Sequence, residues 1–224
     1  MMRFDYAEFK GDGSTWDKEL GGLPGLSFRV AQRLSAWEWE GTASYHNGQA
    51  DYNGQTQAGA PYSTRTDEEV GDFAFRLGRR LEGRYSVMPY AGFGYHLWNR
   101  DILGSGGYFE SYHWKYAWLG AKFMAYQQGA TNFMLDIGWI KPLDPVLRVA
   151  AYNASLNPES RDGLRLMLTS HLALSENTML ILEPYFEYWQ LGRSPAVTTG
   201  GNTVYEPASK TKNIGFNLRL GRMF

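Results

Sequence analysis

The sequence contains no cysteine, no long apolar run and no excess of either charge sign. Without cysteine, the 224 residues can form no disulfide, no thiolate metal site and no thiol nucleophile. No stretch of about 18 apolar residues is present, which excludes a transmembrane helix. Lys and Arg together number 22 and Asp and Glu 23, so the charge balance points to no nucleic-acid partner. No basic segment followed by an apolar one opens the chain, so we expect no signal peptide in it.

Aromatic residues and glycine are plentiful, and apolar residues recur at every second position. Aromatics make up 16% of the chain, with 15 Tyr and 8 Trp, and Gly occurs 26 times. Alternation of apolar and polar residues is typical of strands with one face toward an apolar environment, and no long helix is needed to explain the pattern. The alternating runs cover 2–10, 25–34, 37–47, 70–81, 85–98, 110–127, 131–141, 162–174, 178–191 and 212–224.

The segments between these runs alternate between very short and long. Two or three residues follow the second, fourth, sixth and eighth runs, whereas the other gaps are longer and rich in polar residues and glycine. Short turns, long loops and an even number of strands are typical of outer-membrane barrels. We therefore predict an all-β fold, a single antiparallel transmembrane β-barrel over 1–224 with about ten strands. Its short turns and both termini would be periplasmic and its long loops extracellular. The segment 142–160 could hold two further strands, so eight to twelve strands stay possible.

The two faces of run 162–174 differ as expected for a barrel in lipid. One face is a row of leucines around Leu166, whereas the opposite face carries Arg165 and Thr169. A soluble barrel with an apolar interior would be the alternative, and the register of the hairpins distinguishes the two. With the short turns as hairpins, opposite charges or polar groups face each other on three of the four hairpins, which stabilises strand pairs. The predicted pairs are Arg165–Glu187, Thr169–Glu183, Lys122–Asp136 and Arg33–Glu38.

The fourth hairpin shows no such pair, because its predicted register places Arg76 opposite Tyr90 and Arg80 opposite Ser86. Charges paired on one face nevertheless fit a polar lumen inside a lipid-facing shell. The charged residues of inward parity, which we predict to form a lumen network, are Arg29, Arg33, Glu38, Glu40, Arg76, Arg80, Lys122, Asp136, Arg165, Glu183, Glu187 and Arg219, with Asp72 on the same face. A narrow barrel must fill its interior with such groups, so we favour a largely plugged lumen. A narrow, porin-like passive channel for small solutes is the alternative.

The last run, NIGFNLRLGRMF at 213–224, alternates strictly and ends on Phe224. It resembles the C-terminal strand of outer-membrane barrel proteins, which typically ends in an aromatic residue. In that class the insertion machinery recognises this strand, so the resemblance implies an insertion signal at Phe216, Leu218, Leu220 and Phe224. Arg222 departs from the pattern, although an arginine near the rim can extend its charge to water. The resemblance is to a class, that of small opacity-type or omptin-sized barrels. It implies a location in the bacterial outer membrane, in contact with its lipid and lipopolysaccharide.

Histidines are the candidates for catalysis. His46 and His96 fall at the loop ends of inward faces, where Asp101 and Glu110 also lie. A histidine next to a carboxylate can act as a general base. Omptin proteases use acidic residues with a histidine at the outer mouth, and barrel-type lipid A deacylases use histidine and serine. The chain is shorter than omptins and shows no matching motif. We therefore expect no enzyme, no metal and no cofactor, with a rim hydrolase that uses His46 or His96 as the alternative.

The long loops carry aromatic side chains, namely Trp16, Tyr52, Tyr62, Tyr108, Tyr152 and Tyr205. Tyr and Trp on polar loops often contact partners, whereas aromatics near strand ends also anchor barrels at the membrane interface. Both interpretations stay open. The function predicted first is a barrel that presents its surface loops for binding or adhesion to an extracellular ligand, or that has a structural role.

Overall fold

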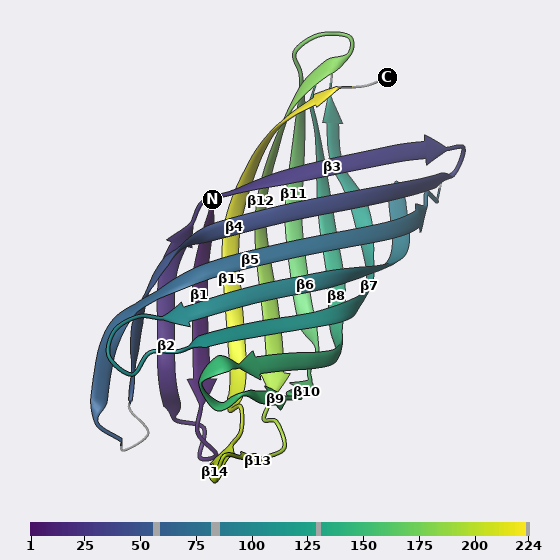
Figure 1. Cartoon of the computed structure of the whole chain (residues 1–224). Coiled ribbons are helices and arrows are strands. Elements are labelled where there is room, and N and C mark those ends of the chain that lie inside the picture. The colour runs from purple at the N-terminus through teal and green to yellow at the C-terminus, as the bar shows by residue number, and fades with distance from the viewer. Residues whose placement is uncertain (56–58, 82–85, 129–130, 223–224) are drawn as a thin grey trace.

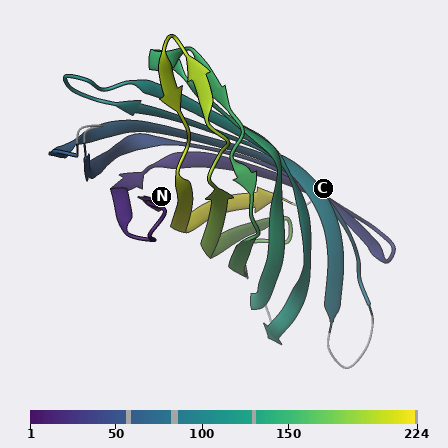
Figure 2. The ribbon, with the colours of Figure 1, turned by 90° about the horizontal axis from the view of Figure 1, so that it is seen from below.

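The computed structural model describes residues 1–55, 59–81, 86–128 and 131–222, and most of these form one antiparallel sheet that curves around a lumen (Figures 1 and 2). The long strands are β1 (Met2–Phe9), β2 (Thr15–Leu23), β3 (Gly25–Leu34), β4 (Trp37–Gln55), β5 (Pro61–Arg79), β6 (Val87–Ile102), β7 (Phe109–Gln128), β8 (Thr131–Val149), β11 (Gly163–Ala173), β12 (Thr178–Gly192) and β15 (Ala208–Arg222). Short elements at the loop end are η1 (Ala150–Tyr152), β9 (Ala154–Leu156), β10 (Glu159–Ser160), β13 (Val197–Thr199) and β14 (Asn202–Val204). No helix among the described residues is long and apolar enough to cross a membrane.

The ring closes where β15 pairs with both β12 and β1. Strands β2 and β3 act as one strand interrupted at Pro24, because both pair with β4 in a single register, with Gly21 opposite Ala50 and Gly25 opposite His46. Proline has no N–H to give to the ladder, which accounts for the interruption. With β2 and β3 counted together, the described part of the chain forms a ring of ten strands, which confirms the predicted fold and strand number.

Several segments predicted as loops are strand extensions instead. The segment 48–69 is mostly strand, because β4 continues to Gln55 and β5 begins at Pro61. The outward residues here are polar, as at Gln49 and Asp67, so the apolar face that reveals a strand in the sequence is missing. The ladder continues nonetheless, with Gln49 opposite Asp67. The segment 142–160 adds length to β8 and two short strands, but no further strand of the ring.

Outward-facing apolar side chains form a band around the turn-side part of the barrel. Its members are highly exposed, as Phe93 (65%) and Leu218 (63%) illustrate. The band includes Phe28, Val30, Tyr45, Phe73, Phe75, Phe93, Leu119, Ile137, Trp139, Leu168, Phe216, Leu218 and Leu220. An apolar outer band of this kind is typical of a surface in contact with lipid. Outward residues nearer the loops, such as Gln49, Asp67 and Asn99, are polar, so the barrel wall extends beyond the band on that side.

Three of the four predicted registers are correct, and one is wrong by two residues. Arg165 lies opposite Glu187, Lys122 opposite Asp136 and Arg33 opposite Glu38. In the fourth hairpin, Arg76 lies opposite Gly92 rather than Tyr90. A shift of two residues keeps every side chain on its face, so the alternation of the sequence cannot distinguish the two registers.

The N-terminus lies at mid-height on the barrel wall (Figure 1). Met2 is opposite Gly215, about half-way along β15, and the amino group of Met1 donates to the carbonyl of Phe216 at 3.1 Å. The prediction that both termini lie at the turn end is therefore wrong for Met1. On the turn side of this point the described residues place no strand between the edges of β3 and β15, although Arg219 Nε donates to Ser27 Oγ across the gap at 3.1 Å.

Candidate functional site: the filled lumen

The part of the lumen nearer the short turns contains a network of buried charges. Glu183, which is fully buried, accepts Arg29 Nη1 at 2.6 Å and also pairs with Arg219. Glu40 lies 3.5 Å from Arg29, 2.6 Å from Arg76 and 2.9 Å from Lys122. Glu40 and Glu183 therefore join basic groups of β3, β5, β7 and β15, and this network crosses the lumen.

Asp136 connects this network to the neighbouring aromatic residues Tyr90 and Trp118. It accepts hydrogen bonds from Arg76 and, at 2.5 Å, from the hydroxyl of Tyr90. The Arg76 guanidinium lies 4.8 Å from the ring centroids of both Tyr90 and Trp118, which adds cation–π contacts. Each charge here has an opposite charge nearby, as buried charges require.

Two charged residues that face each other in a correctly predicted register do not always form an ion pair. Arg165 does lie 3.6 Å from Glu187. Lys122 faces Asp136 but contacts Glu40 and, at 3.1 Å, Glu38. Directly opposed side chains on one strand pair can diverge, and the narrow lumen brings strands from the far side within reach.

The remaining predicted network residues lie near the turn end. Arg80 lies 3.5 Å from Glu38. Arg33 is exposed, and the described residues place no acidic group within ion-pair distance of it. The predicted set is thus divided into a central network, the separate Arg165–Glu187 pair and the single Arg33 at the mouth.

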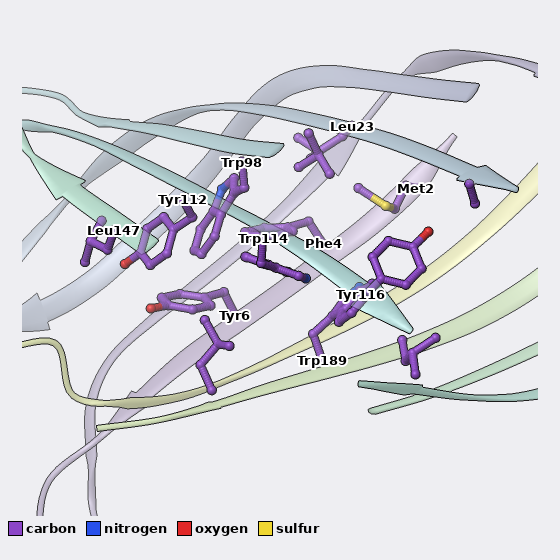
Figure 3. Packing of buried hydrophobic residues seen from close by; sticks show 14 of the residues in the cluster. Met2, Phe4, Tyr6, Leu23, Trp98, Tyr112, Trp114, Tyr116, Leu147 and Trp189 are labelled. Carbon is purple, nitrogen blue, oxygen red and sulfur yellow. The ribbon is translucent and has the colours of Figure 1, made fainter. Parts of the chain in front are cut away.

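Buried aromatic side chains line the lumen on the loop side of the charge network, and Figure 3 shows several of them. The Trp98 and Tyr112 rings stack with centroids 4.3 Å apart, and Trp114 and Trp189 meet edge to face at 5.5 Å. Both geometries are favourable for aromatic pairs. The members that Figure 3 labels are Met2, Phe4, Tyr6, Leu23, Trp98, Tyr112, Trp114, Tyr116, Leu147 and Trp189.

His96 lies inside this aromatic layer and contacts a carboxylate. Its Nδ1 is 3.2 Å from Asp72 Oδ2, and the Tyr116 hydroxyl donates to Asp72 Oδ1 at 2.9 Å. The imidazole stacks on Trp114, with ring centroids 4.4 Å apart. The two-residue error in the predicted register hid this contact, because Asp72 is opposite His96 only in the true register.

The rim site proposed from the sequence is not assembled. His46 and His96 are buried at mid-lumen rather than at the rim. Asp101 is exposed on the outer wall, and Glu110 belongs to a different cluster. The other two histidines are also separate from this site. His113 is half-buried beside Tyr95 on the outer face, and His171 Nδ1 lies 2.7 Å from Asn132 Oδ1 near the turn end.

A second charged cluster, which we name the Arg100 cluster, fills the lumen beyond the apolar band. Arg100 is almost fully buried and lies 3.1 Å from Glu8, 2.8 Å from Glu110 and 3.6 Å from Asp17. Its carboxylates are Glu8, Asp17, Glu19, Glu68, Glu110 and Glu206. Sequence reasoning missed this cluster, because most of its members lie on strand extensions that looked like loops.

Acidic groups outnumber basic ones in the Arg100 cluster, and this changes their protonation. Burial raises the pKa of the Glu110 carboxyl to about 7, and the charge of Glu8 adds to the effect while Arg100 opposes it. Burial likewise raises the pKa values of Asp17, Glu19 and Glu206 well above their usual range. The cluster therefore holds protons near neutral pH.

The last loop closes over the Arg100 cluster. The backbone N–H of Ser194 donates to the Glu206 carbonyl at 2.9 Å, and the N–H of Glu206 donates to Ser194 Oγ at 2.8 Å. Glu206 is buried and accepts the Tyr112 hydroxyl at 2.8 Å. The segment 193–207, with its β13–β14 hairpin, is thus fixed at the loop end of the lumen.

Two cavities lie along the lumen. A cavity of about 40 Å³ lies beside His46, Asp72, His96 and Arg165. A much larger cavity of about 1070 Å³ occupies the turn end, between Arg33, Arg80 and Met179. Among the described residues, no group of three or more His, Asp or Glu side chains could hold a metal ion.

The aromatics predicted to be exposed on loops are mostly packed. Tyr52 is buried, and its hydroxyl donates to Asp17 at 3.2 Å. Tyr108 and Tyr152 pack against the aromatic layer. Tyr205 is 36% exposed under the Arg193 guanidinium, 4.0 Å from its ring centroid. Trp16 and Tyr62 are half-buried, so the loop end offers few free aromatic side chains.

The C-terminal strand has the lipid-facing pattern that its sequence predicts. Phe216, Leu218 and Leu220 point outward and are 46%, 63% and 74% exposed. Phe224 lies outside the described residues. The role of this strand as an insertion signal stays a prediction.

Comparison with known proteins supports the fold. No family model and no curated protein sequence matches the chain. Among solved structures, the barrel is similar to the outer membrane protease OmpT from Escherichia coli, with a TM-score of 0.66 and 8% identity over 100% of this chain and 93% of that one. The β domain of the Bordetella autotransporter BrkA gives a TM-score of 0.38 and 12% identity, covering 100% of this chain and 97% of that one. The chain therefore has the fold of bacterial outer-membrane β-barrels, as the sequence predicted. At these identities the likeness says nothing about activity.

Proposed function

We propose that the protein is a non-conducting barrel of the bacterial outer membrane, which keeps its lumen closed and meets extracellular ligands or surfaces at its loop end. One observation carries this proposal: side chains cross the lumen at successive levels. The levels are the Glu40–Glu183 network, the aromatic layer and the Arg100 cluster. The cavity of about 40 Å³ beside His96 and Arg165 has room for about one water molecule.

The proposal also specifies which part of the outer membrane contacts each part of the outer surface. The apolar band would contact membrane lipid, and the polar wall beyond it would lie at the level of lipopolysaccharide. The strand that carries Phe216, Leu218 and Leu220 would be read by the insertion machinery. Their outward, exposed placement supports this role.

Single-channel conductance of the refolded protein in a planar bilayer tests the proposal. We expect no current from barrels whose migration on a gel shifts on heating, which shows that they are folded. A known porin with a water-filled channel, refolded into the same bilayer, serves as the positive control for the recording. Steady, salt-dependent current from the unaltered protein would overturn the proposal in favour of a narrow channel.

A hydrolase is the second candidate, and the contact between His96 and Asp72 favours it. Such a pair can act as a general base. The chain also has the fold of the OmpT protease, so a hydrolase on this fold is conceivable in chemical terms. Against this function, the imidazole is buried and stacked on Trp114, so a peptide at the outer mouth would not reach it. We expect no cleavage of a library of quenched fluorescent peptides. Cleavage that Asp72→Asn and His96→Gln both abolish would establish the hydrolase.

A further inference from the structure

The cavity at the turn end of the lumen, which we name the vestibule, is lined by more basic than acidic groups. The basic residues are Arg29, Arg33, Arg80, Lys122, Arg219 and Arg222, against the acidic Glu38 and Glu40. Six basic groups against two acidic ones leave an excess of four positive charges with His171 neutral, and Glu183, which pairs with Arg29 and Arg219, lowers this excess to three. Part of this charge is compensated at the deep end, where Glu40 lies near Arg29 and Lys122.

The basic groups nearer the mouth are less compensated. Arg80 lies 3.5 Å from Glu38, and it shares this carboxylate with Lys122, which also contacts Glu40 at 2.9 Å. Arg33 has no ion-pair partner among the described residues and is exposed. Guanidinium groups bind phosphate and carboxylate oxygens in a bidentate way, which makes this end of the vestibule suited to an anion.

The vestibule also has an apolar lining. Met134 on β8 and Met179 and Ile181 on β12 belong to other strands than Arg33 and Arg80, whereas Met88 on β6 and Met124 on β7 lie beside Lys122. Methionine side chains are flexible and polarisable, so they adapt to an irregular apolar partner. The gap between β3 and β15 adds outward-facing apolar groups to the same cavity, namely Leu26, Phe28, Leu218 and Leu220.

We propose that the vestibule binds a lipid with an anionic phosphate headgroup, whose phosphate lies against Arg33 and Arg80 and whose acyl chain lies along the methionines. The arrangement of basic and apolar groups carries the inference. A free phosphate would leave the methionine surface facing water, whereas an uncharged apolar ligand would leave the arginines without an anion. At about 1070 Å³ the vestibule exceeds the pockets that hold ordinary small ligands and has room for a headgroup with part of a chain.

The vestibule shares Arg29, Glu40, Lys122 and Arg219 with the Glu40–Glu183 network, and the variants that test it leave these residues unchanged. A barrel that conducts could still bind the lipid, and a silent barrel could lack it. The conductance test and the binding test can therefore fail separately.

Native mass spectrometry in an uncharged detergent tests the proposal. Phosphatidylglycerol, zwitterionic phosphatidylcholine and inorganic phosphate are added separately and then in competition. We expect phosphatidylglycerol to bind at least about tenfold more tightly than phosphatidylcholine, a difference of about 1.4 kcal/mol. Inorganic phosphate at millimolar concentration should not displace it.

Two variants assign the binding to the vestibule. Arg33→Gln/Arg80→Gln removes the less compensated charges and should weaken phosphatidylglycerol binding about tenfold or more, because each guanidinium contact to phosphate is charge-assisted. Met134→Gln/Met179→Gln keeps the side-chain length and should weaken binding of the lipid as well. The control Arg65→Gln/Arg161→Gln removes the same charge from exposed positions of the loop end and should leave binding unchanged.

Each contrary result overturns the proposal. Equal binding of the two lipids, or an unchanged affinity of Arg33→Gln/Arg80→Gln, would mean that lipid binds on the outer band alone. Displacement by inorganic phosphate, with no effect of Met134→Gln/Met179→Gln, would mean a site for free phosphate rather than for lipid. Migration on a heat-shift gel verifies that every variant is folded before binding is compared.

Discussion

Glu183→Gln tests whether the lumen is held together by buried charges. Glu183 is fully buried and bridges Arg29, at 2.6 Å, and Arg219. Arg29 keeps Glu40 at 3.5 Å in the variant, whereas Arg219 loses the one acidic group that the described residues place within ion-pair distance of it. Breaking a buried pair by removing one partner costs about 3–5 kcal/mol, because a buried charge is left without compensation. We expect a loss of this size in the free energy of unfolding.

A second substitution separates charge from packing. Adding Arg219→Met to Glu183→Gln removes the uncompensated guanidinium and keeps an apolar side chain of similar length. The double variant should recover about half of the lost stability or more, a coupling of the kind that double-mutant cycles measure between contacting residues. Glu159→Gln is the control, because its pair with Arg161 is about half-exposed on both sides and should be worth less than about 1 kcal/mol.

Urea unfolding in lipid vesicles, followed by tryptophan emission and by heat-dependent migration, gives the free energies. A loss below about 1 kcal/mol for Glu183→Gln would refute the reasoning, since it would equal that of an exposed pair. Failure of Arg219→Met to recover any stability would also refute it, because the loss would then come from packing or from water in the lumen.

Three further outcomes are expected from the same unfolding assay. Leu166→Arg, on the lipid-facing row of β11, should cost about 2–4 kcal/mol, whereas Leu172→Arg near the turn should cost about 0–1 kcal/mol; equal costs would mean that the band is misplaced. Gly94→Ala should cost about 1–3 kcal/mol, because a Cβ there would overlap the Tyr116 ring, whereas Gly41→Ala meets no atom within 4 Å and should be almost neutral. Stability should fall as pH rises from about 4.5, the range of an unfolded glutamate, to about 7, because the raised pKa of Glu110 makes the folded state bind more protons than the unfolded chain. Glu110→Gln should reduce this slope, and an unchanged slope would place the titration elsewhere.

Much of the barrel follows from the sequence alone. Strict alternation around Leu166, Phe216 and Leu218 assigns the lipid face, because a strand repeats every two residues and lipid leaves room for little else. Two- and three-residue turns, as at Ser35–Ala36, determine the register of a hairpin almost completely. For this reason the strand number, the inward parity and three registers could be predicted.

The tertiary structure decided which inward charges meet. Lys122 faces Asp136 on the neighbouring strand, yet it contacts Glu38 and Glu40, which are reached only because the sheet closes. Contacts between side chains across a lumen depend on the radius of the barrel and the tilt of its strands, and a local sequence pattern determines neither.

The structure of the loop end also could not be predicted from the sequence. Beyond the apolar band both faces of the strands carry polar groups, so Arg100 and Glu68 gave no alternation of apolar and polar residues to reveal their strands. Only the continued ladder of backbone hydrogen bonds places them in one cluster. The sequence by itself thus determined the part of the protein that lipid constrains, whereas the closed sheet decided the contents of the lumen, because those contacts join residues far apart in the chain.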